Sequence, residues 1–79
     1  MAKYEITYYI VKVNKEELKQ PDEVLDAHPD EVGRMIKRRA DDMGDKFDFA
    51  VVEIRAHEIG GTDAFKYRYT SPGSYGYGD

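Results

Sequence analysis

The sequence predicts an α+β fold in which one main helix, about residues 29–43, packs on a three- to four-stranded, mostly antiparallel sheet in the order ββαββ. One segment has apolar residues at helical spacing, three others alternate as strands do, and a glycine-rich turn joins the last two strands. A chain of 79 residues holds one core. We therefore expect a single domain over residues 1–70 and a flexible tail over residues 71–79.

The first predicted strand covers about residues 4–13. Its alternate residues form one face of Tyr4, Ile6, Tyr8 and Ile10 and another of Glu5, Thr7, Tyr9, Val11 and Val13. Because both faces contain apolar side chains, we expect this strand to be central in the sheet or covered on both sides.

Residues 14–28 allow more than one interpretation. Asn14 followed by Glu17 is the pattern of a capping box, which predicts a short helical turn that ends at Pro21. Residues 23–27 then form either a short strand or part of a second short helix. We favour the strand, because three to four strands cover one helix face better than two.

The main helix begins at Pro29, where the missing N–H of proline is harmless. Gly33 weakens its second turn by up to ~1 kcal/mol relative to alanine, and Gly44 is expected to end it as a left-handed cap residue. The apolar stripe consists of Val32, Met35, Ile36, Ala40 and Met43. The expected ion pairs, each four residues apart, are Asp30–Arg34, Lys37–Asp41 and Arg38–Asp42.

Two more strands follow, over residues 47–58 and 64–70, and form a hairpin around Gly60 and Gly61. In the first of them, the apolar face holds Val52, Ile54 and Ala56, and the solvated face holds Glu53, Arg55 and His57. In the second, Phe65, Tyr67 and Tyr69 alternate with Lys66, Arg68 and Thr70.

The composition excludes several classes of protein. There is no cysteine, and therefore no disulfide framework, thiolate nucleophile or cysteine zinc site. Charges interrupt the N-terminal segment, unlike a signal peptide, and no apolar run approaches the ~20 residues of a membrane span. We therefore expect a cytoplasmic protein that does not enter a membrane. A net charge of −4 disfavours a duplex-DNA binder, which needs an uncompensated basic face.

The sequence contains no catalytic, cofactor-binding or metal-binding motif. The cluster Asp26, His28, Asp30 and Glu31 has no spacing typical of a metal loop and is interpreted as a helix entry. His57 beside Glu58 is interpreted as ordinary surface. The paired glycines lie between strands and do not open a helix, so they predict no phosphate loop. We expect no enzymatic activity, no cofactor and no metal.

Binding to a larger protein or protein complex is the function that the sequence favours. Tyrosine and arginine are enriched at binding hot spots, and the final strand offers an edge to which another strand can add. The acidic segment over residues 14–31 is also suited to steer the chain toward a basic partner. The expected contact residues are Glu16, Glu17, Asp22, Glu23, Arg34, Arg38, Tyr9, Tyr67, Tyr69, Tyr75 and Tyr77.

Two alternatives remain open. A tyrosine-bearing sheet with a basic helix face around Arg34 and Arg38 suits single-stranded RNA or DNA. The acidic total and the acids four residues after Lys37 and Arg38 argue against it. The other alternative is a structural subunit of an assembly, whose oligomeric state the sequence does not determine.

The general organisation resembles that of small phage-encoded proteins that bind and inhibit host machinery. The shared features are small size, absence of cysteine, acidic composition and strands packed on one helix over about residues 3–70. The resemblance implies an inhibitor or regulator of a larger protein in the host cytoplasm. No specific motif carries it, so it assigns no residue roles.

Overall fold

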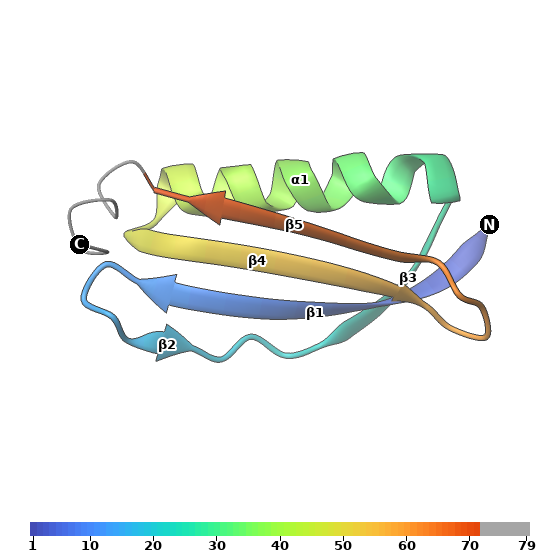
Figure 1. The fold of residues 1–79 in the computed structure, drawn as a ribbon, viewed down its shortest axis with the longest axis horizontal. Helices are drawn as coiled ribbons and strands as arrows, with labels where there is room; N and C mark the ends of the chain where they lie inside the picture. The colour runs from blue at the N-terminus through green and yellow to red at the C-terminus, as the bar shows by residue number, and fades with distance from the viewer. Residues whose placement is uncertain (72–79) are drawn as a thin grey trace.

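The computed structural model describes residues 1–71 and has one helix packed on one face of a five-stranded antiparallel sheet (Figure 1). The elements are β1 (Ala2–Lys12), β2 (Glu17–Leu18), β3 (Glu23–Ala27), α1 (Pro29–Lys46), β4 (Phe49–Glu58) and β5 (Ala64–Thr70). The predicted α+β class is confirmed. The sheet has five strands rather than three or four, and the order is βββαββ rather than ββαββ.

Strand β1 is the centre of the sheet. It pairs with β4 from Tyr4 opposite Glu58 to Lys12 opposite Phe49, with an irregularity after Val11. On its other side, β1 pairs with β3 near its beginning and with β2 near its end. Strand β5 pairs with β4 and lies at the opposite edge of the sheet (Figure 1). The expectation of a central first strand is therefore confirmed.

Residues 14–20 are not helical, so the predicted short helical turn is wrong. The chain turns tightly instead: the N–H of Lys15 donates to the carbonyl of Lys12 at 2.9 Å, and Lys15 has a positive φ of 72°. The Asn14 side chain accepts a hydrogen bond from the N–H of Glu16 at 3.0 Å. Asn14 therefore stabilises a turn here. The same sequence pattern can also cap a helix, because the side chain of asparagine can bond to the backbone in either structure. The favoured short strand is confirmed as β3.

The core lies between α1 and the sheet. Because strand residues alternate between faces, the even-numbered residues of β1, the even-numbered residues of β4 from Val52 onward and the odd-numbered residues of β3 and β5 share the core face. The buried core residues are Tyr4, Ile6, Ile10, Ala27, Val32, Ile36, Ala40, Phe49, Val52, Ile54 and Ala56. Partly buried around them lie Ala2, Tyr8, Leu25, Met35, Met43, Phe65, Tyr67 and Tyr69.

The helix does not end at Gly44, and the predicted cap there is wrong. Helix α1 continues to Lys46, and the N–H of Phe47 donates to the carbonyl of Met43 at 3.1 Å. A Cβ atom on Gly44 would lie 2.2–2.4 Å from the ring of Tyr69. Glycine at this position therefore allows β5 to approach the helix closely, which is a packing role that helix-ending rules do not anticipate. Among the described residues, no helix has both the length and the apolar character that crossing a membrane requires.

Tyr4 lies fully buried in the core. Its ring meets Phe65 edge-on, with the ring centroids 6.1 Å apart and the planes at 63°. Within residues 1–71 its hydroxyl has no hydrogen-bond partner. Burial, and then the charges of Glu58 and Asp63, raise the pKa of Tyr4 above its usual value. A buried hydroxyl without a partner destabilises the fold, because it gives up hydrogen bonds to water.

The two glycines of α1 predict opposite responses to alanine. A Cβ atom on Gly33 would meet only Phe65, at an ordinary 3.8 Å. We expect Gly33→Ala to raise the free energy of unfolding by about 0.5–1 kcal/mol through helix propensity. We expect Gly44→Ala to lower it by about 1–2 kcal/mol, because the clash with Tyr69 exceeds that gain. Urea unfolding followed by circular dichroism measures both.

The control for this pair is a Tyr69→Ala background. Without the ring, Gly44→Ala is expected to stabilise the protein as Gly33→Ala does, because the close contact is gone. A Gly44→Ala variant that remains destabilising in this background would show that the clash with Tyr69 is not the cause.

Removing the hydroxyl of Tyr4 is expected to stabilise the protein. Tyr4→Phe keeps the ring against Phe65 and removes the buried polar group. The midpoint of thermal unfolding should rise by roughly 4 °C for a domain of this size. A lower midpoint would mean that the hydroxyl makes a stabilising hydrogen bond. Tyr9→Phe, whose hydroxyl is on the surface, is the matched control and should leave the midpoint unchanged.

Candidate interaction site on the open sheet face

The sheet face opposite the core is open to solvent. No element of residues 1–71 packs on it, and most of its side chains are exposed. It carries the odd-numbered residues of β1, the odd-numbered residues of β4 from Val51 onward and the even-numbered residues of β5. Its cross-strand rows are Val11–Val51–Thr70, Tyr9–Glu53–Arg68, Thr7–Arg55–Lys66 and Glu5–His57–Ala64.

Glu53 is buried at the centre of this open face. Only 4% of the residue is exposed, although it stands on the side of β4 that the sequence predicts to be solvated. The Nε of Arg55 donates to one carboxylate oxygen at 2.8 Å, and the Nε of Arg68 donates to the other at 3.1 Å. Burial by itself would raise the pKa of Glu53, but the hydrogen bonds and charges of the two arginines outweigh it and lower the pKa. The carboxylate therefore stays ionised and holds both arginines.

The two guanidinium groups can still donate hydrogen bonds to a ligand. Each contacts Glu53 through Nε, and their terminal amino groups make no hydrogen bond within residues 1–71. The side chains of Arg55 and Arg68 are 54% and 55% exposed. Lys66 stands opposite Arg55 on the same face, is exposed and has no acidic partner in the described chain. Two cations therefore bind the Glu53 carboxylate, and a third stands opposite Arg55 in the neighbouring row of the same face.

Tyr9 adds an aromatic side chain beside this cluster. It stands directly opposite Glu53, is 45% exposed, and its hydroxyl makes no hydrogen bond within residues 1–71. A shallow hollow of about 390 Å³ lies at this point of the face. It is lined by Thr7, Tyr8, Tyr9, Glu53, Arg55 and Arg68. We call Tyr9, Arg55, Lys66 and Arg68, together with Glu53, the open-face cluster.

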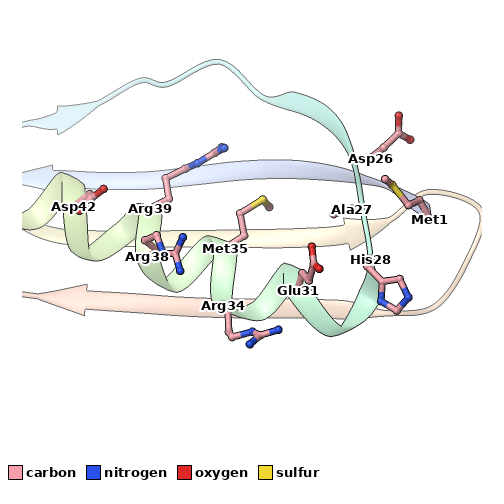
Figure 2. A pocket seen from close by; sticks show the side chains of 10 residues that line it. All are labelled: Met1, Asp26, Ala27, His28, Glu31, Arg34, Met35, Arg38, Arg39 and Asp42. Atoms are coloured by element: carbon pink, nitrogen blue, oxygen red, sulfur yellow. The ribbon is translucent and has the colours of Figure 1, made fainter.

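A second hollow, of about 790 Å³, lies between α1 and the β3 side of the sheet (Figure 2). Arg34 and Arg38 line it, one turn apart. Neither has an acidic partner in residues 1–71, so the pairs predicted for them do not form, whereas Lys37–Asp41 does at 3.0 Å. The charged residues along this hollow are balanced, with arginines Arg34, Arg38 and Arg39 against acids Asp26, Glu31 and Asp42. This hollow therefore carries less net positive charge than the open-face cluster.

The predicted acidic contact residues divide into two groups. Glu23 is engaged within the fold: the Tyr8 hydroxyl donates to it at 2.5 Å, and Arg39 contacts both residues. Burial and this hydrogen bond to Glu23 raise the pKa of Tyr8. The remaining acids are exposed in or beside β2 and before β3, and their carboxylates have no partner in residues 1–71. They are Glu16, Glu17 and Asp22.

The predicted tyrosines lie in three different environments. Tyr9 is on the open face, whereas Tyr67 and Tyr69 are on the core face, half-buried against α1. The Tyr67 hydroxyl donates to Asp41 at 3.0 Å, and the Nζ of Lys37 lies 5.5 Å from its ring centroid. The open face described by residues 1–71 therefore presents one tyrosine rather than an aromatic row. Tyr75 and Tyr77 lie outside the described residues.

Sequence reasoning missed Glu53, Arg55, Lys66 and Arg68 as site residues. Alternation places Glu53 and Arg55 on one strand face, and Lys66 and Arg68 on one face of the next strand. What it lacks is the hairpin register, which sets Arg68 opposite Glu53. A signal was nevertheless available in the sequence. One strand of the hairpin has an acid followed two residues later by an arginine, and the other strand has cations at alternate positions.

Within residues 1–71, no group of three histidine or acidic side chains is arranged to hold a metal ion. His28 instead caps α1, with its Nδ1 accepting from the N–H of Asp30 at 3.4 Å. No protein-family model, curated protein or solved structure matches the chain. The role of the open-face cluster therefore has to follow from its own geometry.

The low pKa of Glu53 predicts a loss of stability in acid. Because the folded pKa lies below the usual value of 4.5, the unfolded chain binds the proton first. The stabilisation from Glu53 is present above pH 4.5 and disappears as the pH falls through the folded pKa. At pH 7, Glu53→Gln is expected to lower the free energy of unfolding by about 1–2 kcal/mol, and this difference should shrink as the pH falls toward 3.

Chemical denaturation at several pH values measures this difference. Glu5→Gln is the matched control, because Glu5 is an exposed acid on the same face with no ion pair in residues 1–71. The free energy of unfolding of Glu5→Gln should change with pH in the same way as that of the unmodified protein. A constant difference between the unmodified protein and Glu53→Gln at all pH values would contradict the assignment.

Proposed function

We propose that this chain is a small non-enzymatic protein-binding module that captures an acidic segment of a larger protein on its open sheet face. The observation that carries the proposal is the orientation of Arg55 and Arg68. The buried carboxylate of Glu53 holds both through Nε, and within residues 1–71 their terminal amino groups make no hydrogen bond.

Carboxylates are the chemistry that suits these free amino groups. A guanidinium group binds a carboxylate through two parallel hydrogen bonds, and such charge-assisted bonds are stronger than neutral ones. Because Glu53 already orders the two arginines, a ligand does not have to immobilise them. Lys66 adds a further positive charge to the same face. An acidic segment therefore meets a cationic surface whose geometry is set in advance.

The composition of the cluster also suits a protein contact. Tyrosine and arginine are the residue types that most often dominate binding energy at protein interfaces. Tyr9 presents a half-exposed ring beside the arginines, and a hydrophobic side chain of the partner can pack on it. Nothing in the described cluster resembles a nucleophile with an activating base, so binding rather than catalysis is its proposed role.

A regulatory role follows from this mode of binding. A module of 9.1 kDa that covers an acidic segment blocks the access of other basic partners to that segment. The exposed acids Glu16, Glu17 and Asp22 lie near the edge of the sheet away from β5. They repel an acidic ligand there and favour its approach to the β4–β5 side. We therefore propose that the chain acts as an inhibitor or regulator of a larger protein or complex.

Single-stranded nucleic acid is the second candidate, because Tyr9 can stack a base while Arg55 and Arg68 contact phosphates. The placement of Tyr67 and Tyr69 on the core face counts against it. Sheets that bind single strands by stacking use two or three aromatic residues, and this face has one within residues 1–71.

Removing the arginines of the open face is expected to weaken the binding of an acidic ligand. The test variant combines Arg55→Gln, Arg68→Gln and Glu53→Gln, so that no buried carboxylate loses its partners. The matched control combines Arg34→Gln, Arg38→Gln and Glu31→Gln, which changes the net charge equally at the other hollow. Fluorescence anisotropy with a labelled peptide of glutamate and threonine should give at least a roughly tenfold rise in Kd for the test variant and little change for the control.

The same titration distinguishes the alternatives. Binding of the peptide should weaken as salt is added, since the contacts are ionic. Equal loss in the two triple variants would mean that net charge rather than the open-face cluster is recognised. Tighter binding of an oligouridylate of similar charge than of the peptide, lost in Tyr9→Ser, would replace the proposal with single-strand binding. Circular dichroism confirms that each variant is folded.

A further inference from the structure

Strand β5 has an unpaired outer edge. Among the described residues it pairs only with β4, and no other backbone group bonds to its outer side (Figure 1). The two ends of the strand are held, by the Glu58–Asp63 hydrogen bonds before it and by the bond from Ser71 to the Ala50 carbonyl after it. A row of free N–H and C=O groups on such an edge is the template for another strand.

The two faces of β5 differ in chemistry. Lys66 and Arg68 lie on the open face and are exposed. Phe65, Tyr67 and Tyr69 lie on the core face with partly exposed rings. A strand added beside β5 would therefore meet cations at every second residue and the exposed edges of aromatic rings, called aromatic rims below, at the residues between them.

The edge is also rigid. Tyr67 is fixed to α1 by its hydrogen bond to Asp41 and by Lys37 over its ring. Tyr69 packs on the backbone of Gly44, and Arg68 is held by Glu53. Because β5 is ordered before any ligand arrives, strand addition requires the ordering of the partner alone.

A second copy of this chain does not suit this edge. In an antiparallel pair of two β5 strands with their aromatic residues on the same face, Lys66 and Arg68 lie next to the same cations of the other copy. Like charges in neighbouring strands are destabilising. The opposite edge of the sheet is interrupted between β2 and β3, at residues 19–22, and carries exposed acids. Strand β5 is therefore the edge that an acidic chain can reach.

We propose that the acidic segment binds as an additional strand along β5, with acidic residues at every second position facing Lys66 and Arg68 and apolar residues between them facing the aromatic rims. This inference rests on the proposed function and adds to it a sequence pattern for the ligand. The acidic residues on the open face lie beside the free amino groups of Arg68, and the main-chain hydrogen bonds add an affinity that is independent of charge.

Peptides of one composition test the pattern. One peptide alternates glutamate with valine and threonine, and a second contains the same residues with the glutamates in one block. The alternating peptide is expected to bind the full-length protein about tenfold more tightly. N-methylation of alternate residues then tests the hydrogen bonds, because only one edge of an added strand faces β5. Methylation of one alternate set should weaken binding about tenfold, and methylation of the other set should have little effect.

Charge reversal at a single position gives a second test. Lys66 is exposed and has no acidic partner in the described chain, so Lys66→Glu should preserve the fold. It should weaken the binding of the alternating peptide several-fold. A peptide with lysine in place of the glutamate that faces position 66 should bind this variant with the original affinity. The matched control is Lys19→Glu, an exposed lysine between β2 and β3. This control should leave binding of both peptides unchanged.

Each outcome decides between the two proposals. Equal binding of alternating and block peptides, or equal effects of the two methylated sets, would overturn strand addition and leave capture of acidic segments in place. Failure of every acidic peptide to bind would overturn the proposed function itself. A concentration-dependent dimer in sedimentation that Lys66→Glu stabilises would show that a second copy occupies the edge, and would also overturn the inference.

Discussion

The register of β1 against β4 is the constraint on which the rest of the structure depends. It sets Ile10 opposite Val52 and Ile6 opposite Ala56, and so gathers the apolar side chains on the face that α1 covers. The same register sets Tyr9 opposite Glu53 on the open face. A slip by one residue would move every side chain of β1 to the other face. Because β1 also pairs with β2 and β3, its position determines both layers of the protein.

The buried Glu53 follows from this arrangement and links stability to the proposed binding. A buried carboxylate is unfavourable unless it is paired. Arg55 on the same strand and Arg68 on the neighbouring strand supply the pairing. The same bonds order the guanidinium groups and direct their remaining donors to solvent. The pairing that contributes to folding therefore also orders the two arginines that we propose to bind an acidic partner.

The helix is anchored to the sheet on both sides by polar contacts around the core. On one side, Tyr67 bonds to Asp41 on α1, and on the other, Arg39 of α1 contacts Glu23 and Tyr8. These contacts hold β5 and β3, which, like β2, have no partner strand on their outer sides within residues 1–71. The edge proposed to accept a strand is thus held in place by contacts with α1, which favours binding without rearrangement.

The fold class, the main helix, the hairpin and the short strand β3 were accessible from the sequence, because alternation and helical spacing are local signals. The turn at Asn14 and the continuation of the helix past Gly44 to Lys46 were not, because one local pattern is compatible with two structures. Only the tertiary structure decided that Glu53 is buried and that Arg68 reaches it. That depends on strand register, and alternation assigns a side chain to a face but does not say which residue stands beside it in the next strand.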